Sequence, residues 1–436
     1  MEGRVTVVGA GLAGCEAAWA LATRGIPVRL VEMKPVKFSP AHKSAGFAEL
    51  ICSNSLKAAR LDSAAGLLKE EMRRLGSLLT RCAEEAKVPA GGALAVDREE
   101  FSRLATQALE SHPLIEITRQ EVTSIPDGLC ILATGPLTSE ALSSEIAALC
   151  GEGLHFFDAA APIVTRESLD MTKCFLASRY GKGGDDYINC PLNKAEYETF
   201  IEALLTAETA PLHDFDTDPQ VYEGCMPIEV LASRGRDAAR FGPMKPVGLT
   251  DPRTGHRPWA VVQLRTENRE NTLYNLVGFQ THLKFGEQKR VFGLIPGLEH
   301  AEFARYGVMH RNTFLKSPGL LGADFAVKAR PTLYFAGQIT GVEGYMESAS
   351  SGLLAGVNAA RQVRGKEPMV LPVTTMMGAL SHYVSEYDGK DFQPMGANFG
   401  VLPPLPEKIR DKRERYAALA ARALTDLEPF VKEEQP

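Results

Sequence analysis

The sequence VTVVGAGLAGCEAAWALATRGIPVRLVE, residues 5–32, has the order of a strand, a glycine turn, a helix and a second strand. Residues 5–8 are apolar, and after the turn small and apolar residues recur at helical spacing as far as Leu21. A glycine and a proline then end the helix, and a second apolar run leads to Glu32. This order predicts a nucleotide-binding βαβ unit at the start of the chain.

The glycine turn has the spacing Gly-X-Gly-X-X-Gly, which dinucleotide-binding proteins place at a pyrophosphate. Gly9 permits the tight turn, Gly11 lets the backbone approach the phosphates, and Gly14 lets the helix pack closely on the strand. Free N–H groups and the positive end of the helix dipole favour bound phosphate. Glu32, at the end of the second strand, is placed to accept hydrogen bonds from ribose hydroxyls. The expected dinucleotide contacts are Gly9, Ala10, Gly11, Leu12, Ala13, Gly14 and Glu32.

Length and composition bound the class of protein. With 436 residues, 44% of them hydrophobic and 23% charged, the chain is expected to form two or three domains of ordinary globular composition. It has no apolar run of the roughly 20 residues that a membrane span needs and no signal-peptide pattern, so we expect a cytoplasmic protein without a membrane partner. The eight cysteines are widely spaced and form no CxxC pairs. Neither a metal site nor a disulfide framework is therefore expected.

Charge is unevenly distributed along the chain. The net charge is −6, yet residues 225–330 contain 16 Lys and Arg against 9 Asp and Glu. A basic region on an acidic protein is typical of proteins that bind nucleic acid or a phosphorylated substrate. Basic residues scattered over a solvated surface explain the same numbers equally well.

Two further segments are expected to return to the nucleotide. Residues 129–136 form an apolar strand that ends in Ala-Thr-Gly, where small residues let the chain pass next to a cofactor. Residues 333–338 form another buried strand and lead through the loop 341–348 to a helix rich in small residues, whose start is aimed at the cofactor. Only a flavin explains both ends of the chain. The expected contacts are Thr134, Gly135, Gly337, Gln338, Glu343, Gly344 and Tyr345, the last against the isoalloxazine ring.

Between these segments the sequence pattern changes. From residue 156 onward it predicts short mixed strands and helices, with no second Gly-X-Gly-X-X-Gly. We therefore predict an α/β fold in which a Rossmann-type FAD-binding domain, residues 1–155 and 328–436, contains an inserted α+β substrate domain, residues 156–327. The terminal segment, with its apolar run 392–400, is expected to lie over the active site.

A long segment without a regular period, residues 33–61, follows the first unit. Long ordered loops in compact domains usually carry function. This one contains Cys52-Ser53-Asn54-Ser55, small polar residues that cap helices or contact a cofactor, and Asn54 is an expected cofactor contact. Cys52 is expected just ahead of a helix start and near Lys57, both of which favour a thiolate. Residues 63–87 are expected to form one amphipathic helix.

Five motifs carry a resemblance to a known family: GAGLAG with Glu32, ICSNS at 51–55, EGCMPIE at 223–229, FAGQITGVEGYMES at 335–348 and FQPMGANFG at 392–400. Together they closely resemble the TrmFO family, bacterial folate- and FAD-dependent tRNA uracil-5 methyltransferases related to the GidA/MnmG flavoproteins. The similarity runs nearly end to end. It implies methylation at carbon 5 of uridine 54 in the T-loop of tRNA. Methylenetetrahydrofolate would supply the one-carbon unit. FAD, after its reduction by NAD(P)H, would supply the hydride.

The chemistry of such a methylation agrees with the residue types present. Carbon 5 of uracil is a poor nucleophile, and a thiolate added at carbon 6 turns the ring into an enolate that attacks an electrophilic methylene. Loss of the carbon 5 proton leaves an exocyclic methylene, and reduction of this methylene to methyl by a flavin hydride is accompanied by loss of the thiolate. The resemblance implies that Cys52 is the attacking thiol and that Cys225 assists proton transfer or protects the first thiol. The residues alone leave open which cysteine does which, or whether either is an ordinary buried thiol.

Two other functions stay open at this point. A GidA-like enzyme that modifies the tRNA wobble uridine with a partner protein predicts a longer helical C-terminal domain than a chain ending at Pro436 contains. A plain FAD-dependent NAD(P)H oxidoreductase, or a noncatalytic flavin-binding protein, predicts that both thiols and the basic region are incidental. The leading prediction requires tRNA, folate and NAD(P)H, and no obligate protein partner.

Overall fold

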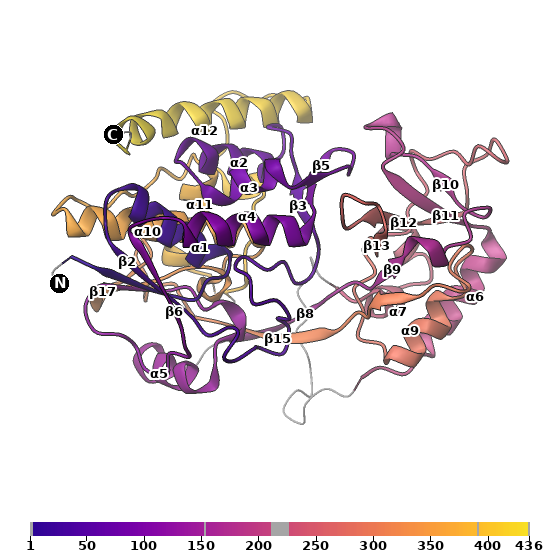
Figure 1. Ribbon diagram of the computed structural model, residues 1–436. Helices are drawn as coiled ribbons and strands as arrows, with labels where there is room; N and C mark the ends of the chain where they lie inside the picture. The colour runs from indigo at the N-terminus through magenta and orange to yellow at the C-terminus, as the bar shows by residue number, and fades with distance from the viewer. Residues whose placement is uncertain (1–2, 152–153, 211–225, 390–391, 435–436) are drawn as a thin grey trace.

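The computed structural model describes residues 3–151, 154–210, 226–389 and 392–434. These residues form two parts side by side, and the larger part contains both ends of the chain (Figure 1). A two-stranded antiparallel ribbon runs between the parts, with β8 (Leu154–Ala159) paired to β15 (Met309–Phe314). The chain therefore crosses to the smaller part and returns from it along neighbouring strands.

A six-stranded sheet forms the centre of the larger part. Its strands follow the order β16 (Ala326–Val327), β17 (Arg330–Phe335), β7 (Cys130–Leu132), β1 (Val5–Val8), β2 (Val28–Glu32) and β6 (Ile115–Arg119). All neighbouring pairs are parallel except β16 with β17. Because side chains alternate along a strand, Val7 and Ile131 join the apolar core on one face, whereas Val8 and Leu132 join the core on the other.

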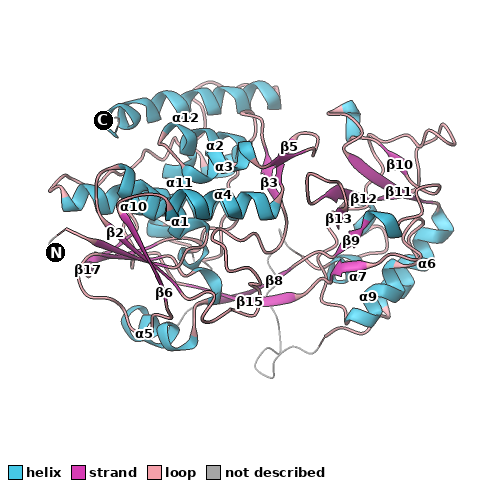
Figure 2. Ribbon diagram, viewed as in Figure 1, coloured by secondary structure: helices cyan, strands magenta, loops and turns pink. Residues whose placement is uncertain are grey.

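Helices cover both faces of this sheet (Figure 2). α1 (Leu12–Thr23) and α10 (Tyr345–Val363) pack together on one face, and α5 (Glu140–Cys150) packs on the other. The backbones of α1 and α10 approach closely because a glycine lies at the contact. A Cβ at Gly352 would lie 2.0 Å from the carbonyl oxygen of Ala13. The small-residue pattern of both helices is thus a packing requirement.

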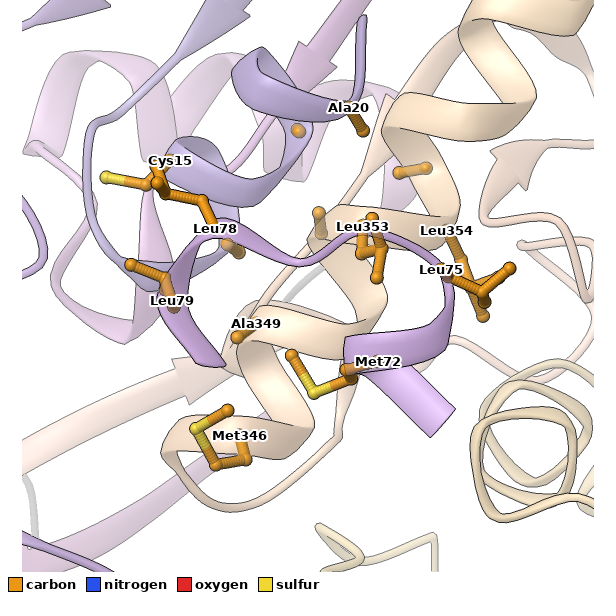
Figure 3. Packing of buried hydrophobic residues seen from close by; sticks show 14 of the residues in the cluster. Cys15, Ala20, Met72, Leu75, Leu78, Leu79, Met346, Ala349, Leu353 and Leu354 are labelled. Atoms are coloured by element: carbon orange, nitrogen blue, oxygen red, sulfur yellow. The ribbon is translucent and has the colours of Figure 1, made fainter. Parts of the chain in front are cut away.

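Figure 3 shows the apolar core where α10 meets α1, α2 (Ala64–Arg74) and α3 (Leu78–Glu85). The labelled side chains are Cys15, Ala20, Met72, Leu75, Leu78, Leu79, Met346, Ala349, Leu353 and Leu354. The prediction of one helix over residues 63–87 is wrong, because the chain turns at Gly76 with a φ of 84°, a conformation that glycine adopts readily. The turn lets both short helices bury an apolar face.

The other elements of the larger part form its outer layers. They are β3 (Ser55–Ala58), β5 (Ala93–Val96) and β4 (Lys87–Val88) in a small sheet, and α4 (Arg98–Glu110), α11 (Met376–Glu386) and α12 (Lys412–Glu434). The buried carboxylate of Glu71 in α2 accepts hydrogen bonds from the N–H groups of Met376 and Met377, both at 2.8 Å, and so satisfies the start of α11. Among the described helices, none has the length and apolar character needed to span a membrane.

The smaller part is built on an antiparallel six-stranded sheet. Its order is β10 (Phe175–Leu176), β11 (Tyr187–Leu192), β12 (Ala260–Thr266), β13 (Leu273–Leu276), β9 (Ile163–Thr165) and β14 (Phe303–Arg305). A second apolar core forms with α6 (Lys194–Leu205), α7 (Ile228–Ser233), α8 (Ala238–Phe241) and α9 (Phe285–Phe292). The predicted fold class, a Rossmann-type unit with an inserted α+β part, is confirmed. The domain boundaries at residues 155 and 328 stay a prediction.

Candidate active site

A cavity of about 420 Å³ lies at the carboxyl ends of the parallel strands, the edge at which open α/β sheets bind their ligands. It is lined by Cys52 and most of the predicted cofactor contacts: Gly9, Gly11, Leu12, Ala13, Glu32, Thr134, Gly135, Gly337, Gln338, Glu343, Gly344 and Tyr345. Segments far apart in the sequence therefore meet in one place. The volume falls within the range of small-molecule sites.

The glycine turn has the three features predicted for it. Gly9 has a φ of 96°, and a Cβ there would lie 2.5 Å from the carbonyl oxygen of Ala133. A Cβ on Gly14 would lie 1.7 Å from the carbonyl oxygen of Gly9, so α1 packs directly on the turn. A Cβ on Gly11 would meet no atom within 4 Å, and α1 begins there without a side-chain cap. The start of α1 is therefore open toward the cavity, as a bound pyrophosphate requires.

Glu32, at the end of β2, is only 5% exposed and lines the cavity. Its carboxylate oxygens accept hydrogen bonds from the backbone N–H groups of Ala10 at 2.7 Å and Lys34 at 3.0 Å. These bonds fix the carboxylate beside the glycine turn. Each oxygen has a further lone pair, so Glu32 keeps the capacity to accept hydrogen bonds from ribose hydroxyls.

Another wall of the cavity is formed where α10 begins. Its N-cap, Gly344, has a φ of 119° and makes no side-chain cap. In the loop before it, Gln338 Nε2 donates to Glu343 Oε2 at 2.5 Å. The terminal segment closes this loop, because the N–H of Glu343 donates to the carbonyl oxygen of Met395 at 2.8 Å. The positive ends of two helices, α1 and α10, thus border one cavity.

Cys52 lies in the loop before β3 and lines the same cavity as the glycine turn. Its backbone N–H donates to the hydroxyl oxygen of Tyr345 at 2.6 Å, and the N–H of Ser53 donates to the same oxygen at 3.1 Å. Tyr345 thus joins the start of α10 to the Cys52 loop, a contact that the sequence did not predict. The expected helix start after Cys52 is wrong, because residues 55–58 form β3 and pair with β5.

Two arginines supply positive charge close to Cys52. Arg98, at the start of α4, donates to the two carbonyl oxygens before Cys52 at 2.8 and 3.0 Å, and pairs with Glu267 of the smaller part at 2.5 Å. Arg98 and Arg305 both interact electrostatically with Cys52. Because nearby cations favour a thiolate, Arg98 and Arg305 can supply the activation that was expected from a helix start.

Lys57, the cation that the sequence placed near Cys52, also lines the cavity. Its ammonium group forms an ion pair at 2.6 Å with Glu347, a carboxylate that is only 1% exposed on the first turn of α10. Glu347 also accepts a hydrogen bond from the N–H of Ala397 in the terminal segment at 2.9 Å. The pair therefore joins β3, α10 and the terminal segment, and an effect of Lys57 on the Cys52 thiol stays a prediction.

Three of the predicted cofactor contacts are not among the residues that line the cavity: Ala10, Gly14 and Asn54. The side chain of Asn54 is buried and bonded to protein on all sides. Its Nδ2 donates to the carbonyl oxygens of Val96 and Thr266 at 3.0 and 2.9 Å, and its Oδ1 accepts from Arg265 Nε at 2.9 Å. Thr266 and Arg265 belong to β12, so Asn54 joins the loop of Cys52 to the smaller part.

Sequence reasoning missed the buried charges at this contact between the two parts. Arg265 is 6% exposed and donates from Nη2 to Ser53 Oγ at 2.8 Å, next to Cys52. Glu267, 4% exposed, is the partner of Arg98. The local signal is the presence of Arg265 in the stretch 260–266, whose other residues include four apolar ones, since a charged residue is unusual in a buried strand.

Cys225 lies outside the described residues, so its place in the site stays a prediction. On one side of it, the N–H of Ala210 donates to the carbonyl oxygen of His282, and on the other the N–H of Ile228 donates to that of Gln280, both at 2.8 Å. Gln280 lines the cavity. The described chain on both sides of Cys225 is therefore attached to a segment at the cavity wall.

Comparisons with known proteins agree with this arrangement. Residues 4–367 match the family described as glucose inhibited division protein A. The chain is 61% identical over 429 residues to "Methylenetetrahydrofolate--tRNA-(uracil-5-)-methyltransferase TrmFO" of Acetivibrio thermocellus, covering 98% of both chains. It is 58% identical over 425 residues to the protein of the same name from Enterococcus faecalis, covering 97% of this chain and 98% of that one. Among solved structures, GidA of Aquifex aeolicus shares the fold, with a TM-score of 0.72 and 17% identity over 99% of this chain and 74% of its own.

Proposed function

The chain belongs to the TrmFO family, within the glucose inhibited division protein A family, and we propose that it methylates carbon 5 of uridine 54 in the T-loop of tRNA. In this proposal methylenetetrahydrofolate gives the one-carbon unit, FAD is the bound cofactor and NAD(P)H is its reductant. One observation carries the proposal: Cys52 and the glycine turn line the same cavity. A thiol and a redox cofactor can therefore act on one substrate there.

The residues around the cavity fit FAD. The open position at Gly11 and the uncapped starts of α1 and α10 suit the pyrophosphate, and Glu32 suits the ribose. Gly337, Gln338, Glu343 and Tyr345 would hold the part of the cofactor nearest Cys52. When bound and reduced by NAD(P)H, FAD would supply the hydride that completes the methyl group.

Cys52 is the nucleophile in this mechanism. Its thiolate forms a C–S bond to carbon 6 of the uracil, and the displaced ring electrons make carbon 5 an enolate carbon. Carbon 5 then forms a bond to the methylene carbon of the donor, and one of the two C–N bonds of that carbon breaks. A base, for which Cys225 is our candidate, removes the carbon 5 proton, and the electron pair left on carbon 5 forms the exocyclic C=C bond while the second C–N bond breaks and the folate leaves. When the exocyclic methylene is reduced to methyl, an electron pair returns to carbon 5, re-forms the C5=C6 bond and expels the thiolate, so Cys52 is regenerated.

The groups around Cys52 support these steps. Arg98 and Arg305 stabilise the negative charge of the thiolate before it attacks and after it leaves. The hydroxyl of Tyr345 and the guanidinium of Arg98 hold the backbone on either side of the sulfur. A nucleophile held in this way needs little reorganisation before it attacks.

The test is a reconstituted methyl-transfer assay. The purified protein is incubated with FAD, an unmodified tRNA transcript, methylenetetrahydrofolate and NADPH, and the tRNA is digested and analysed by mass spectrometry. We expect 5-methyluridine from position 54, and none when a transcript with cytidine at that position is used as the control. A modified wobble uridine, or NADPH oxidation without any modified nucleoside, would contradict the proposal. Replacement of NADPH by NADH in the same assay identifies the preferred reductant.

A further inference from the structure

Three aromatic rings of the smaller part are stacked in a column that ends at the protein surface. The rings of Phe303 and Tyr306 have centroids 5.0 Å apart and planes inclined by 8°. The rings of Tyr306 and Phe285 have centroids 4.7 Å apart and planes inclined by 18°. Phe303 packs against the apolar core, Tyr306 is half-buried, and Phe285 is 55% exposed. We call Phe303, Tyr306 and Phe285 the aromatic column.

The aromatic column lies close to the candidate active site. Gln280 and Asn312 line the cavity, and Phe285 and Tyr306 lie only a few residues from them in the chain. Even a fully extended chain of five or six residues spans at most about 20 Å. Arg305, next to Tyr306 in sequence, is near enough to Cys52 to interact with it electrostatically. The outer end of the column is therefore within a few nucleotides of a uridine at Cys52.

Positive charge accompanies the aromatic column. Arg305 lies between Phe303 and Tyr306 in sequence and interacts electrostatically with Cys52, so it carries positive charge from the column toward the cavity. Lys289 is exposed on the same helix as Phe285 and has no ion pair among the described side chains. A free cation on the helix that carries the exposed ring suits a ligand that has both phosphates and flat bases, as an RNA strand does.

We propose that the exposed ring of Phe285 is a stacking platform for an unpaired base of the tRNA substrate, on the strand that leads to the reacting uridine. This proposal rests on the proposed function and adds a binding position outside the cavity. One face of the Phe285 ring is held by Tyr306, which in turn stacks on Phe303, so the platform is rigid before RNA arrives. A rigid, exposed ring binds a base without loss of side-chain freedom and without preference for its identity.

The experiment compares substitutions at Phe285 with a matched control in the same part of the molecule. F285L keeps an apolar side chain but removes the flat ring, and F285W restores a flat ring. The control is F241L, because Phe241 is 75% exposed and belongs to α8, outside the aromatic column. The dissociation constant for unmodified tRNA is measured by filter binding with the FAD-loaded protein, and the KM values for tRNA and for methylenetetrahydrofolate are measured in the methyl-transfer assay.

We expect F285L to weaken tRNA binding about 5- to 150-fold, the effect of removing one stacked base. F285W and F241L should bind tRNA as the wild type does, and none of the three should change the KM for methylenetetrahydrofolate or the oxidation of NADPH without tRNA. The proposal is overturned if F285L binds tRNA like F241L, or if its effect falls on the folate KM, since the ring would then contact the pteridine. A wild type that binds tRNA but makes no 5-methyluridine contradicts the proposed function alone, because the binding comparison still decides the role of Phe285.

Discussion

The two six-stranded sheets contribute to the site in different ways. The parallel sheet contributes mainly backbone: after its strands β1 and β17, Gly9 and Gly337 line the cavity, and Glu32 at the end of β2 adds a carboxylate. The antiparallel sheet contributes side chains: Arg265 of β12 donates to Asn54 and to Ser53 across the contact between the two parts. The cofactor half of the site, formed by the parallel sheet, thus depends on glycines that leave room for a ligand. The charged half, formed where the two parts meet, depends on paired charges.

The two halves should therefore respond to different kinds of substitution. Where a glycine lies against another backbone segment there is no room for a side chain, so one added methyl group in the cofactor half should strongly lower the free energy of unfolding. A buried ion pair between two parts should fail when one partner is removed, because the other charge is left without compensation.

The largest effect is expected at Gly14. A Cβ there would lie 1.7 Å from the carbonyl oxygen of Gly9, so G14A must push α1 away from β1, and we expect a loss of about 4 kcal/mol or more in the free energy of unfolding. G11A is the matched control, since its Cβ meets no atom within 4 Å. G11A should keep the melting temperature of the cofactor-free protein and bind FAD more weakly. Equal melting temperatures for the two variants would refute the division of roles between these glycines.

The next effect concerns the ion pair across the two parts. R98M leaves Glu267, which is 4% exposed, without its partner, and frees the carbonyl oxygens before Cys52. We expect a loss of about 3–5 kcal/mol in the free energy of unfolding, together with slower methyl transfer. On the same helix Arg103 pairs with Glu100 but is 57% exposed, so R103M should cost no more than about 0.5 kcal/mol. Urea unfolding of both variants checks the contrast, and a similar cost for both would show that the pair at Arg98 does not join the parts.

Stability should also depend on pH through the larger part. Burial raises the pKa of Glu71 from 4.5 to about 7, and the hydrogen bonds from Met377 and Met376 offset this only in part. Because the folded state holds a proton that the unfolded state has already lost, the free energy of unfolding should fall as pH rises from about 4.5 to about 7 and level off above. The contribution of this group is roughly 3 kcal/mol. Thermal unfolding across this range should show a weaker decline in E71Q, and parallel curves for E71Q and wild type would disprove the assignment.

The smallest effect is expected at Tyr345. Y345F keeps the ring at the cavity wall but removes the oxygen that accepts the N–H groups of Cys52 and Ser53. Two amides lose their acceptor, which should cost about 1–2 kcal/mol of stability and slow methyl transfer. The visible absorption of bound flavin should not change, because the aromatic ring is still present. If Y345F instead transfers methyl groups at the wild-type rate, the hydroxyl does not position Cys52.

The cofactor half could be predicted from the sequence because its requirements are local. The three glycines of the turn, Glu32 and the small residues after β7 and β17 each meet a need of the neighbouring backbone, and such needs are visible within a few positions. Their convergence on one cavity follows from the order of parallel strands. Gly76, in contrast, breaks the expected long helix by a positive φ, which the helical periodicity on both sides of it conceals.

The charged half could not be predicted because its partners are distant in sequence. Arg98 and Glu267, or Asn54 and Arg265, come together only through the contact between the two parts. The expected helix start after Cys52 failed for a similar reason, since residues 55–58 become a strand only by pairing with β5. The sequence predicts Asn54 as a cofactor contact because it is a small polar residue near a cysteine, whereas its side-chain hydrogen bonds go to protein groups.

The central claim, that a thiol in the nucleotide cavity attacks the uracil, is tested most directly by the methyl-transfer rate of C52A. Cys150 is the matched control, because it has a similar intermediate exposure and lies on α5, outside the cavity. With flavin bound and the fold intact in both variants, we predict that C52A loses at least about 10³-fold in rate and that C150A keeps the wild-type rate. A C52A protein that still forms 5-methyluridine at the rate of C150A would contradict the account.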